Sequence, residues 1–157
     1  MDASHIGNKL TYQLHTGILI IVNNTSIDWF SMKQNTVKTS SFGAELIAAR
    51  IAMEKVKAMR TKLRWFGIPI DRPTYMFCDN ESVVKSTSRA ESTLSKKHQL
   101  ISWHSIWKAI SAGWLKILKE PGVLNLADLF TKQLPISSQN GILNAIYSND
   151  GKSIRNE

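Results

Sequence analysis

The feature of this sequence that most restricts its fold is one long helical stripe. Apolar residues recur every three or four positions from Leu46 to Leu63, which is the period of an amphipathic helix that covers one side of a core. Gly67 and Pro69 follow the stripe and predict that the helix ends near residue 66. At 157 residues, the chain is long enough for one domain with one core.

Strand-like segments lie on both sides of this helix. They are residues 16–23, 26–32, 74–78 and 114–118. The first two predict a hairpin that turns at residues 23–24. Further helices are expected directly after residue 80, over about 95–112 and over 124–132. This order of elements predicts a mixed α/β sheet covered by helices.

The composition narrows the classes of partner. Lys and Arg outnumber Asp and Glu by 20 to 12, which favours a polyanion such as nucleic acid, although a basic domain can also simply be soluble. The single cysteine, Cys78, excludes a disulfide within the chain and a zinc finger, and it fits reducing, intracellular conditions. The longest purely apolar run, residues 18–22, is too short to cross a bilayer, so no membrane partner is expected.

Four acidic residues lie in or beside apolar segments. Glu45 is on the apolar side of the long helix, Asp79 ends the strand at 74–78, Asp128 lies within an apolar turn, and Asp2 opens the chain. Buried carboxylates that converge need divalent cations to neutralise them, and magnesium prefers oxygen ligands. Taken singly, three of them have a simpler explanation, and Asp2 alone indicates almost nothing. Asp79 could cap a helix, Glu45 could interact with the helix dipole, and Asp128 could be an exposed acid.

Five segments carry a family pattern in a fixed order. They are residues 31–37 (SMKQNTV), 42–48 (FGAELIA), 77–82 (FCDNES), 95–104 (SKKH followed by WH) and 125–135 (NLADLFTKQLP). Together they resemble the ribonuclease H domain of copia-type retrotransposon Pol polyproteins. The resemblance spans about residues 1–135, so an RNase H-like domain is expected there. Residues 136–157 are expected to form a loosely ordered tail, in which only 142–147 could make a short amphipathic turn.

The resemblance implies a fold and an activity. The fold is an RNase H-like mixed five-stranded sheet flanked by helices. Its catalytic residues, which are also its metal ligands, would be Asp2, Glu45, Asp79 and Asp128. They would hold two Mg²⁺ ions, with Mn²⁺ as the alternative, and hydrolyse the RNA strand of RNA–DNA hybrids during reverse transcription. A reverse transcriptase would be fused or associated upstream, in cytoplasmic retrotransposon particles with the nucleus as a second location.

Several residues are expected to contact the hybrid. They are Lys33, Asn80, Lys96, Lys97 and His98. Such contacts would be made to phosphates and 2′-hydroxyl groups, not to base edges. The alternative for the lysines is a solvated surface. Trp103 and Trp107 are four residues apart on one helix, which indicates packing more than base stacking.

The chain also departs from the family pattern. Asp2-Ala3-Ser4 lacks the second acid of the usual D-A-D, and residues 121–123 include no histidine before Asp128. In the family, the first Asp lies late in a central strand. The first strand is therefore expected to be truncated at the amino terminus, as in a polyprotein fragment, and its neighbours to be left with unpaired backbone groups. An inactive RNase H-like relic that at most binds nucleic acid thus stays open beside the enzyme. An integrase fits less well, because its Glu comes last. The sequence indicates no oligomeric state.

Overall fold

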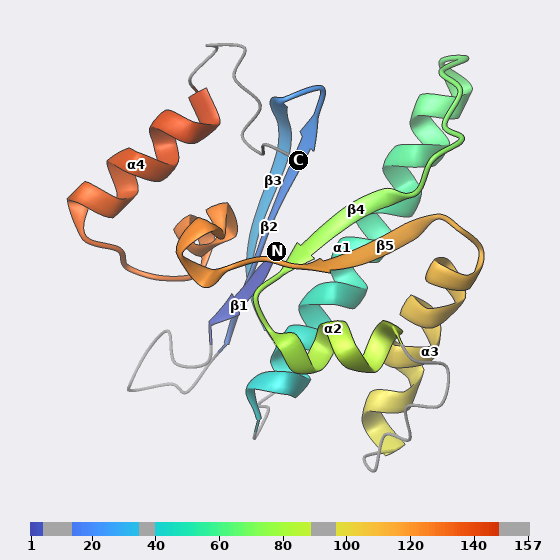
Figure 1. Cartoon of the computed structure of the whole chain (residues 1–157), viewed down its shortest axis with the longest axis horizontal. Coiled ribbons are helices and arrows are strands. Elements are labelled where there is room, and N and C mark those ends of the chain that lie inside the picture. The colour runs from blue at the N-terminus through green and yellow to red at the C-terminus, as the bar shows by residue number, and fades with distance from the viewer. Residues whose placement is uncertain (5–13, 35–39, 89–96, 148–157) are drawn as a thin grey trace.

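A computed structural model describes residues 1–4, 14–34, 40–88 and 97–147. It is a mixed α/β structure with two sheets (Figure 1). The strands are β1 (Asp2–Ser4), β2 (His15–Val22), β3 (Thr25–Lys33), β4 (Thr74–Cys78) and β5 (Leu115–Lys119). The helices are α1 (Ser41–Trp65), α2 (Glu81–Ser88), α3 (Lys97–Ser111) and α4 (Ile136–Tyr147), with 3₁₀ helices η1 (Gly122–Leu124) and η2 (Leu126–Phe130).

The predicted five-stranded sheet is wrong for the described residues, which form sheets of three and two strands. The order β1-β2-β3 is antiparallel, and β4 pairs in parallel with β5. The reason is the length of β1, which has three residues and pairs only with β2. A hydrogen bond from the nitrogen of Met1 to the Phe77 carbonyl (2.9 Å) joins the two sheets where they approach.

The predicted hairpin is confirmed, and its turn chemistry explains it. Asn23 and Asn24 have φ values of 49° and 65°, the left-handed conformation that a two-residue turn requires and that Asn tolerates. The pairing runs from His15 opposite Lys33 to Val22 opposite Thr25, with a bulge near Ile20.

Helix α1 packs against β1, β2, α2 and α3 and forms the centre of the core. Ser40 caps it by accepting a hydrogen bond from the Gly43 amide (3.3 Å). Arg60 differs from Lys62 and Arg64, the exposed basic residues that follow it in α1. It is buried and donates to the Arg72 carbonyl (2.8 Å) and the Thr74 hydroxyl (3.1 Å). The residue therefore fastens the loop that leads into β4.

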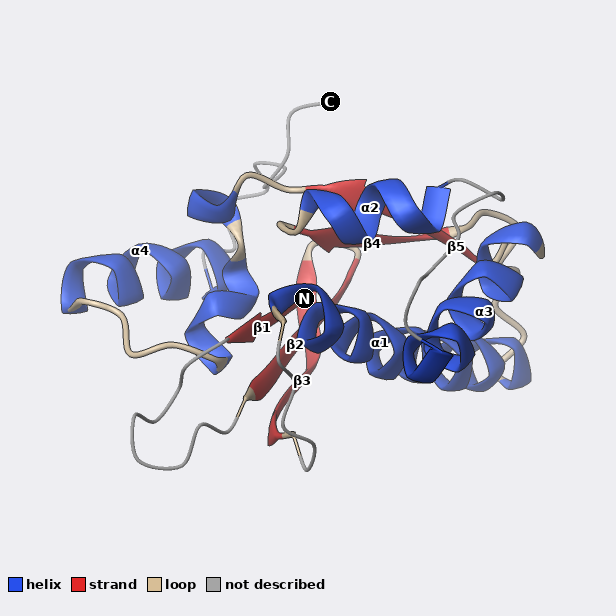
Figure 2. Ribbon diagram, turned by 90° about the horizontal axis from the view of Figure 1, so that it is seen from below, coloured by secondary structure: helices blue, strands red, loops and turns tan. Residues whose placement is uncertain are grey.

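Helix α2 packs on β4 and β5, and α3 packs on α1 (Figure 2). Trp103 is buried, donates from its indole N–H to the Ser86 carbonyl (3.0 Å), and stacks on Trp107 with ring centres 6.3 Å apart. The prediction that this pair packs is confirmed. No helix within the described ranges has both the length and the apolar character needed to span a bilayer.

Two regions differ from the sequence prediction. A single helix was expected over 124–132, but the chain forms η1 and η2, separated by Asn125, whose side chain accepts from the Ala127 amide (3.3 Å). A short turn was expected at 142–147, but α4 begins at Ile136 and packs against β3 and η2. The division of the chain at residue 135 stays a prediction, and residues 148–157 lie outside the described residues.

Candidate metal centre

Acidic side chains from three separate elements meet where β1 and β4 come together. Asp2 lies in β1, Asp79 directly follows β4, and Asp128 lies in η2. A carboxylate oxygen from each of the three lies within 4.8 Å of the other two. Positions 2, 79 and 128 are far apart in the sequence, so only the tertiary fold brings these charges together.

Glu45 extends this group from the side of α1. An oxygen of Glu45, one of Asp79 and the sulfur of Cys78 lie within 4.8 Å of one another. Asp79 therefore belongs to both groups. We call Asp2, Glu45, Asp79 and Asp128 the carboxylate cluster. The structure brings together all four acids that the sequence analysis selected.

Glu45 is buried, and only one of its two carboxylate oxygens accepts a hydrogen bond within the described residues. Its Oε1 accepts a hydrogen bond from the Ala3 amide (3.1 Å), whereas its Oε2 is buried and has no partner within the described part of the chain. Burial first, and then the charges of Asp2 and Asp79, raise the pKa of Glu45 to about 8. The carboxyl group is therefore poorly stabilised as an anion unless a cation approaches it.

Thr131 and Lys132 hold the other side of the carboxylate cluster. Asp2 is 1 % exposed, and its Oδ2 accepts a hydrogen bond from the Thr131 hydroxyl. The ammonium of Lys132 lies 3.4 Å from the same oxygen and 3.0 Å from Oδ2 of Asp128. Burial acts to lower the pKa of Lys132, but its hydrogen bond to Asp128 and the charge of Asp2 outweigh burial and raise it. Lys132 is thus a cation fixed between two acids.

Asp128 also keeps an oxygen without a partner. Its Oδ1 is buried and makes no hydrogen bond within the described residues. Burial is the main cause that raises the pKa of Asp128; Lys132 opposes it, and Asp2 and Asp79 add to it. The unpartnered oxygens of Glu45 and Asp128, among further carboxylates, are the donor set that a hard divalent cation prefers. The residues fit magnesium.

The thiol of Cys78 does not add a soft ligand to this set. Burial and the charge of Glu45 raise the pKa of Cys78 to about 12, so the thiol stays protonated at neutral pH. Cys78 is one sulfur beside four carboxylates, and this donor set favours a hard cation over zinc.

The residues predicted to bind nucleic acid are only partly described. Lys33 is exposed at the end of β3. Asn80 directly precedes α2, and its Oδ1 accepts from the amides of Ser82 (3.0 Å) and Val83 (3.3 Å). Asn80 therefore takes the capping role that had been one explanation for Asp79. Lys96 lies outside the described residues, as do the side chains of Lys97 and His98.

Sequence reasoning missed the roles of Thr131 and Lys132. Both lie within the motif at 125–135, so the signal was present, but the motif alone did not show that they contact Asp2. Asn125, in the same motif, reaches back with its amide nitrogen to the Met1 carbonyl (3.5 Å). The motif thus ties the end of the domain to its beginning.

Known proteins are similar to this chain over most of its length. No protein-family model matches the chain. It is 28 % identical over 133 residues to the retrovirus-related Pol polyprotein from transposon RE1 of Arabidopsis thaliana. It is 26 % identical to that of transposon RE2 from the same plant, and 27 % identical to that of transposon TNT 1-94 of Nicotiana tabacum. Each match covers 85 % of this chain but 9 to 10 % of the relative.

A solved structure shares the fold. The crystal structure of prototype foamy virus protease-reverse transcriptase superimposes with a TM-score of 0.55 and 15 % identity, covering 99 % of this chain and 20 % of that one. The chain is therefore a homologue of a short segment of the retrovirus-related Pol polyproteins of copia-type transposons.

Proposed function

We propose that this chain is a retrotransposon ribonuclease H, which hydrolyses the RNA strand of RNA–DNA hybrids with two magnesium ions. The observation that carries the proposal is the carboxylate cluster. A carboxylate oxygen of Asp79 lies within 4.8 Å of oxygens of Asp2 and Asp128, and one lies within the same distance of an oxygen of Glu45. Four acids gathered in one place, with Asp2 and Glu45 buried, repel one another, and divalent cations are the ordinary reason that such a group persists.

Each member of the carboxylate cluster has an assigned part. Asp2, Asp79 and Asp128 would hold one ion, and Glu45 with Asp79 would hold the second. When bound, the ions would activate the attacking water and stabilise the leaving 3′-oxygen. The Thr131 hydroxyl orients the carboxylate of Asp2.

Substrate recognition is assigned to basic and polar residues of the chain. The net charge of +8 favours a polyanion, and the proposed contacts of Lys33, Asn80, Lys96, Lys97 and His98 would be made to phosphates and 2′-hydroxyl groups. A reverse transcriptase joined or associated upstream would supply the hybrid, in cytoplasmic particles or the nucleus. The relatives' names support a Pol context for this assignment.

Cleavage of an end-labelled hybrid in magnesium tests the proposal. Asp79→Asn should lower the cleavage rate at least about 100-fold, because it weakens a ligand that both ions would share. Asp71→Asn is the matched control, since Asp71 is exposed and lies in the loop before β4. Cleavage of duplex DNA should be absent. Equal cleavage by the unchanged and Asp79→Asn proteins, or none by either, would contradict the proposal.

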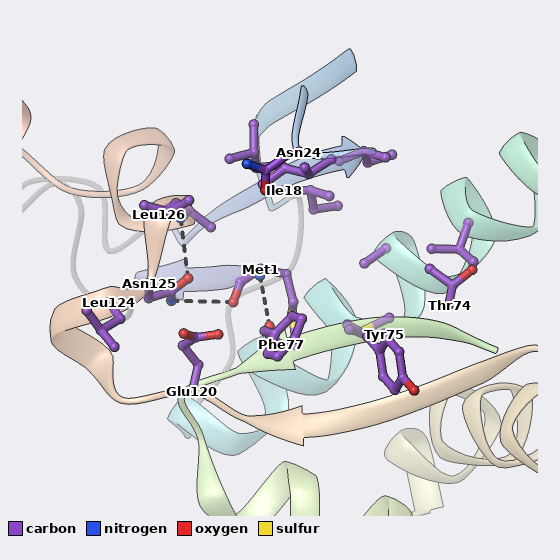
Figure 3. Close-up of a pocket in the computed structure, with 17 residues that line it drawn as sticks. Met1, Ile18, Asn24, Thr74, Tyr75, Phe77, Glu120, Leu124, Asn125 and Leu126 are labelled. Atoms are coloured by element: carbon purple, nitrogen blue, oxygen red, sulfur yellow. Dashed lines mark hydrogen bonds between the residues drawn. The ribbon is translucent and has the colours of Figure 1, made fainter. Parts of the chain in front are cut away.

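The division into two sheets favours a second candidate. Asp2 lies in a strand of three residues that pairs with β2, and the Met1–Phe77 bond joins this segment to β4 (Figure 3); on this reading, so short a strand holds the carboxylate cluster too loosely for catalysis. The chain would then be a catalytically inactive RNase H-like relic that at most binds nucleic acid. Salt-dependent binding of hybrid in fluorescence anisotropy, without cleavage in magnesium or manganese, would favour this candidate.

A further inference from the structure

The carboxyl end of α1 carries two exposed aromatic side chains. Trp65 is the last residue of the helix and Phe66 is its C-cap, and they are 83 % and 81 % exposed. Ile68, two residues further on, is also exposed. Adjacent apolar side chains left in water ordinarily mark a binding surface. In Figure 1 this end of α1 lies at the edge of the molecule, on the side away from α4.

The backbone that carries the two rings is held in place. The Gly67 amide donates to the Arg64 carbonyl (2.9 Å). Gly67 itself has a φ of 74°, the left-handed conformation that commonly ends a helix. Directly beyond, buried Arg60 fastens the loop into β4 through the Arg72 carbonyl (2.8 Å). A ligand of the rings therefore does not have to order the backbone beneath them.

Cations surround the two rings. Residues 55–70 include five basic residues and no acidic one. Lys62 and Arg64 are exposed, and Lys62 lies three and four positions before the rings, which places it beside both on the helix surface. Further back on α1, the ammonium of Lys57 lies 5.5 Å from the ring centre of Trp114. The surface thus combines aromatic rings with positive charge. We call Lys62, Arg64, Trp65 and Phe66 the helix-end patch.

We propose that the helix-end patch binds single-stranded nucleic acid. The bases of a single strand stack on aromatic rings and its phosphates pair with cations, so one ligand matches both features of the patch. An apolar protein surface would leave the cations without opposite charges. A flat membrane would not take up both rings to the same depth, because neighbouring helical residues point about 100° apart. Duplex DNA keeps its base faces stacked inside, away from the rings.

The helix-end patch is separate from the carboxylate cluster. Glu45 and Trp65 lie near opposite ends of α1, and at 1.5 Å per residue they are about 30 Å apart along the helix axis. A short strand stacked on Trp65 therefore does not reach the acids, and its binding needs no divalent cation. This inference does not depend on the proposed function.

Fluorescence anisotropy of a labelled thymidine oligonucleotide of about 12 nucleotides, in EDTA, tests the proposal. The double variant Trp65→Leu with Phe66→Leu keeps apolar side chains but removes both rings, and it should bind at least about tenfold more weakly. Trp65→Phe with Phe66→Tyr keeps two rings and should bind within about threefold of the unchanged protein. Tyr147→Leu is the matched control and should not alter the affinity. Tyr147 is 76 % exposed and ends α4, on the other side of the molecule (Figures 1 and 2).

Two further measurements separate charge from stacking. Lys62→Gln with Arg64→Gln should reduce the slope of log affinity against log salt by about 1.4, because each phosphate contact to a single strand contributes about 0.7. Duplex DNA of the same length should bind equally to the unchanged protein and to the double leucine variant, since its bases do not reach the rings. Equal urea denaturation midpoints would show that the variants fold alike.

Three outcomes would overturn the inference. The first is no binding of the oligonucleotide by the unchanged protein. The second is equal affinity of the unchanged protein and the double leucine variant; binding to phosphatidylserine vesicles that only the unchanged protein shows would then assign the rings to a membrane. The third is an equal loss of affinity for duplex and single strand in the double leucine variant. The cleavage assay is separate, so an active or inactive nuclease alters none of these results.

Discussion

Glu45 should make the stability of this protein depend on pH. Burial and the charges of Asp2 and Asp79 raise the pKa of the folded-state carboxyl from 4.5 to about 8. In the unfolded chain the group returns to its ordinary pKa. Between these two values the folded protein keeps a proton that the unfolded chain has released. The contribution of Glu45 to the free energy of unfolding is therefore complete below pH 4.5 and is lost as the pH rises to about 8.

The size of the effect follows from the two pKa values. The difference between 4.5 and about 8, at 1.36 kcal/mol per pKa unit, gives an upper bound of about 5 kcal/mol. Glu45→Gln keeps an oxygen that can accept from the Ala3 amide, now 3.1 Å away, but carries no ionisable proton. Over the same pH range, position 45 should lower the free energy of unfolding of this variant by less than about 1 kcal/mol.

Urea denaturation in a chelating buffer, followed by tryptophan fluorescence at several pH values from 5 to 8, measures the difference. Glu54→Gln is the matched control, because Glu54 is an exposed acid of the same helix, 3.8 Å from Arg50. The reasoning is refuted if Glu45→Gln loses as much stability with rising pH as the unchanged protein. Magnesium at pH 8 should restore stability to the unchanged protein more than to Glu45→Gln, since the cation stabilises the ionised carboxylate.

Other substitutions test the packing and charge of the same region. Gly17→Ala should destabilise by about 1–3 kcal/mol in urea denaturation, because its Cβ would lie 2.6 Å from the Thr131 side chain and 2.7 Å from the Ala127 carbonyl. Gly141→Ala, in α4 with open space around it, should instead be neutral or stabilising; equal losses would refute the argument. Thr131→Val should cost about 1–3 kcal/mol through the lost donor to a buried acid, and unchanged stability would contradict that role. Lys132→Met should bind manganese more tightly in calorimetry, since the ammonium 3.0 Å from an acid no longer competes; weaker or equal binding would count against it.

Local patterns predicted most of the elements. The two asparagines of the hairpin and the period of α1 depend on near neighbours, so the sequence contains them directly. The arrangement of the sheets, in contrast, does not depend on near neighbours in the sequence. Whether β1 reaches β4 depends on the number of residues that can pair, and three residues pair only with β2. Helix α4 was missed because its first turn is polar, and its packing on β3 and η2 is a tertiary contact.

The carboxylate cluster was found by motif, not by local pattern. Asp128 has a simpler explanation within its own segment, Asp2 alone indicates almost nothing, and nothing near either one indicates that they meet. The same holds for Thr131, whose partner is 129 positions away in the sequence. Contacts of this separation are set by the whole fold, so the family order of the motifs supplied what spacing could not.

The bond between Thr131 and Asp2 has a consequence for synthesis and folding. The amino end of the chain emerges from the ribosome first, but its partners in η2 and at Thr131 and Lys132 come near the end of the domain. Contacts of such long sequence separation form late, because loop closure must come before them. Helices α1 and α3 can assemble while the ribosome is still translating the final segment. The acids at positions 2 and 128 therefore come together only after the segment that contains Thr131 and Lys132 has been synthesised.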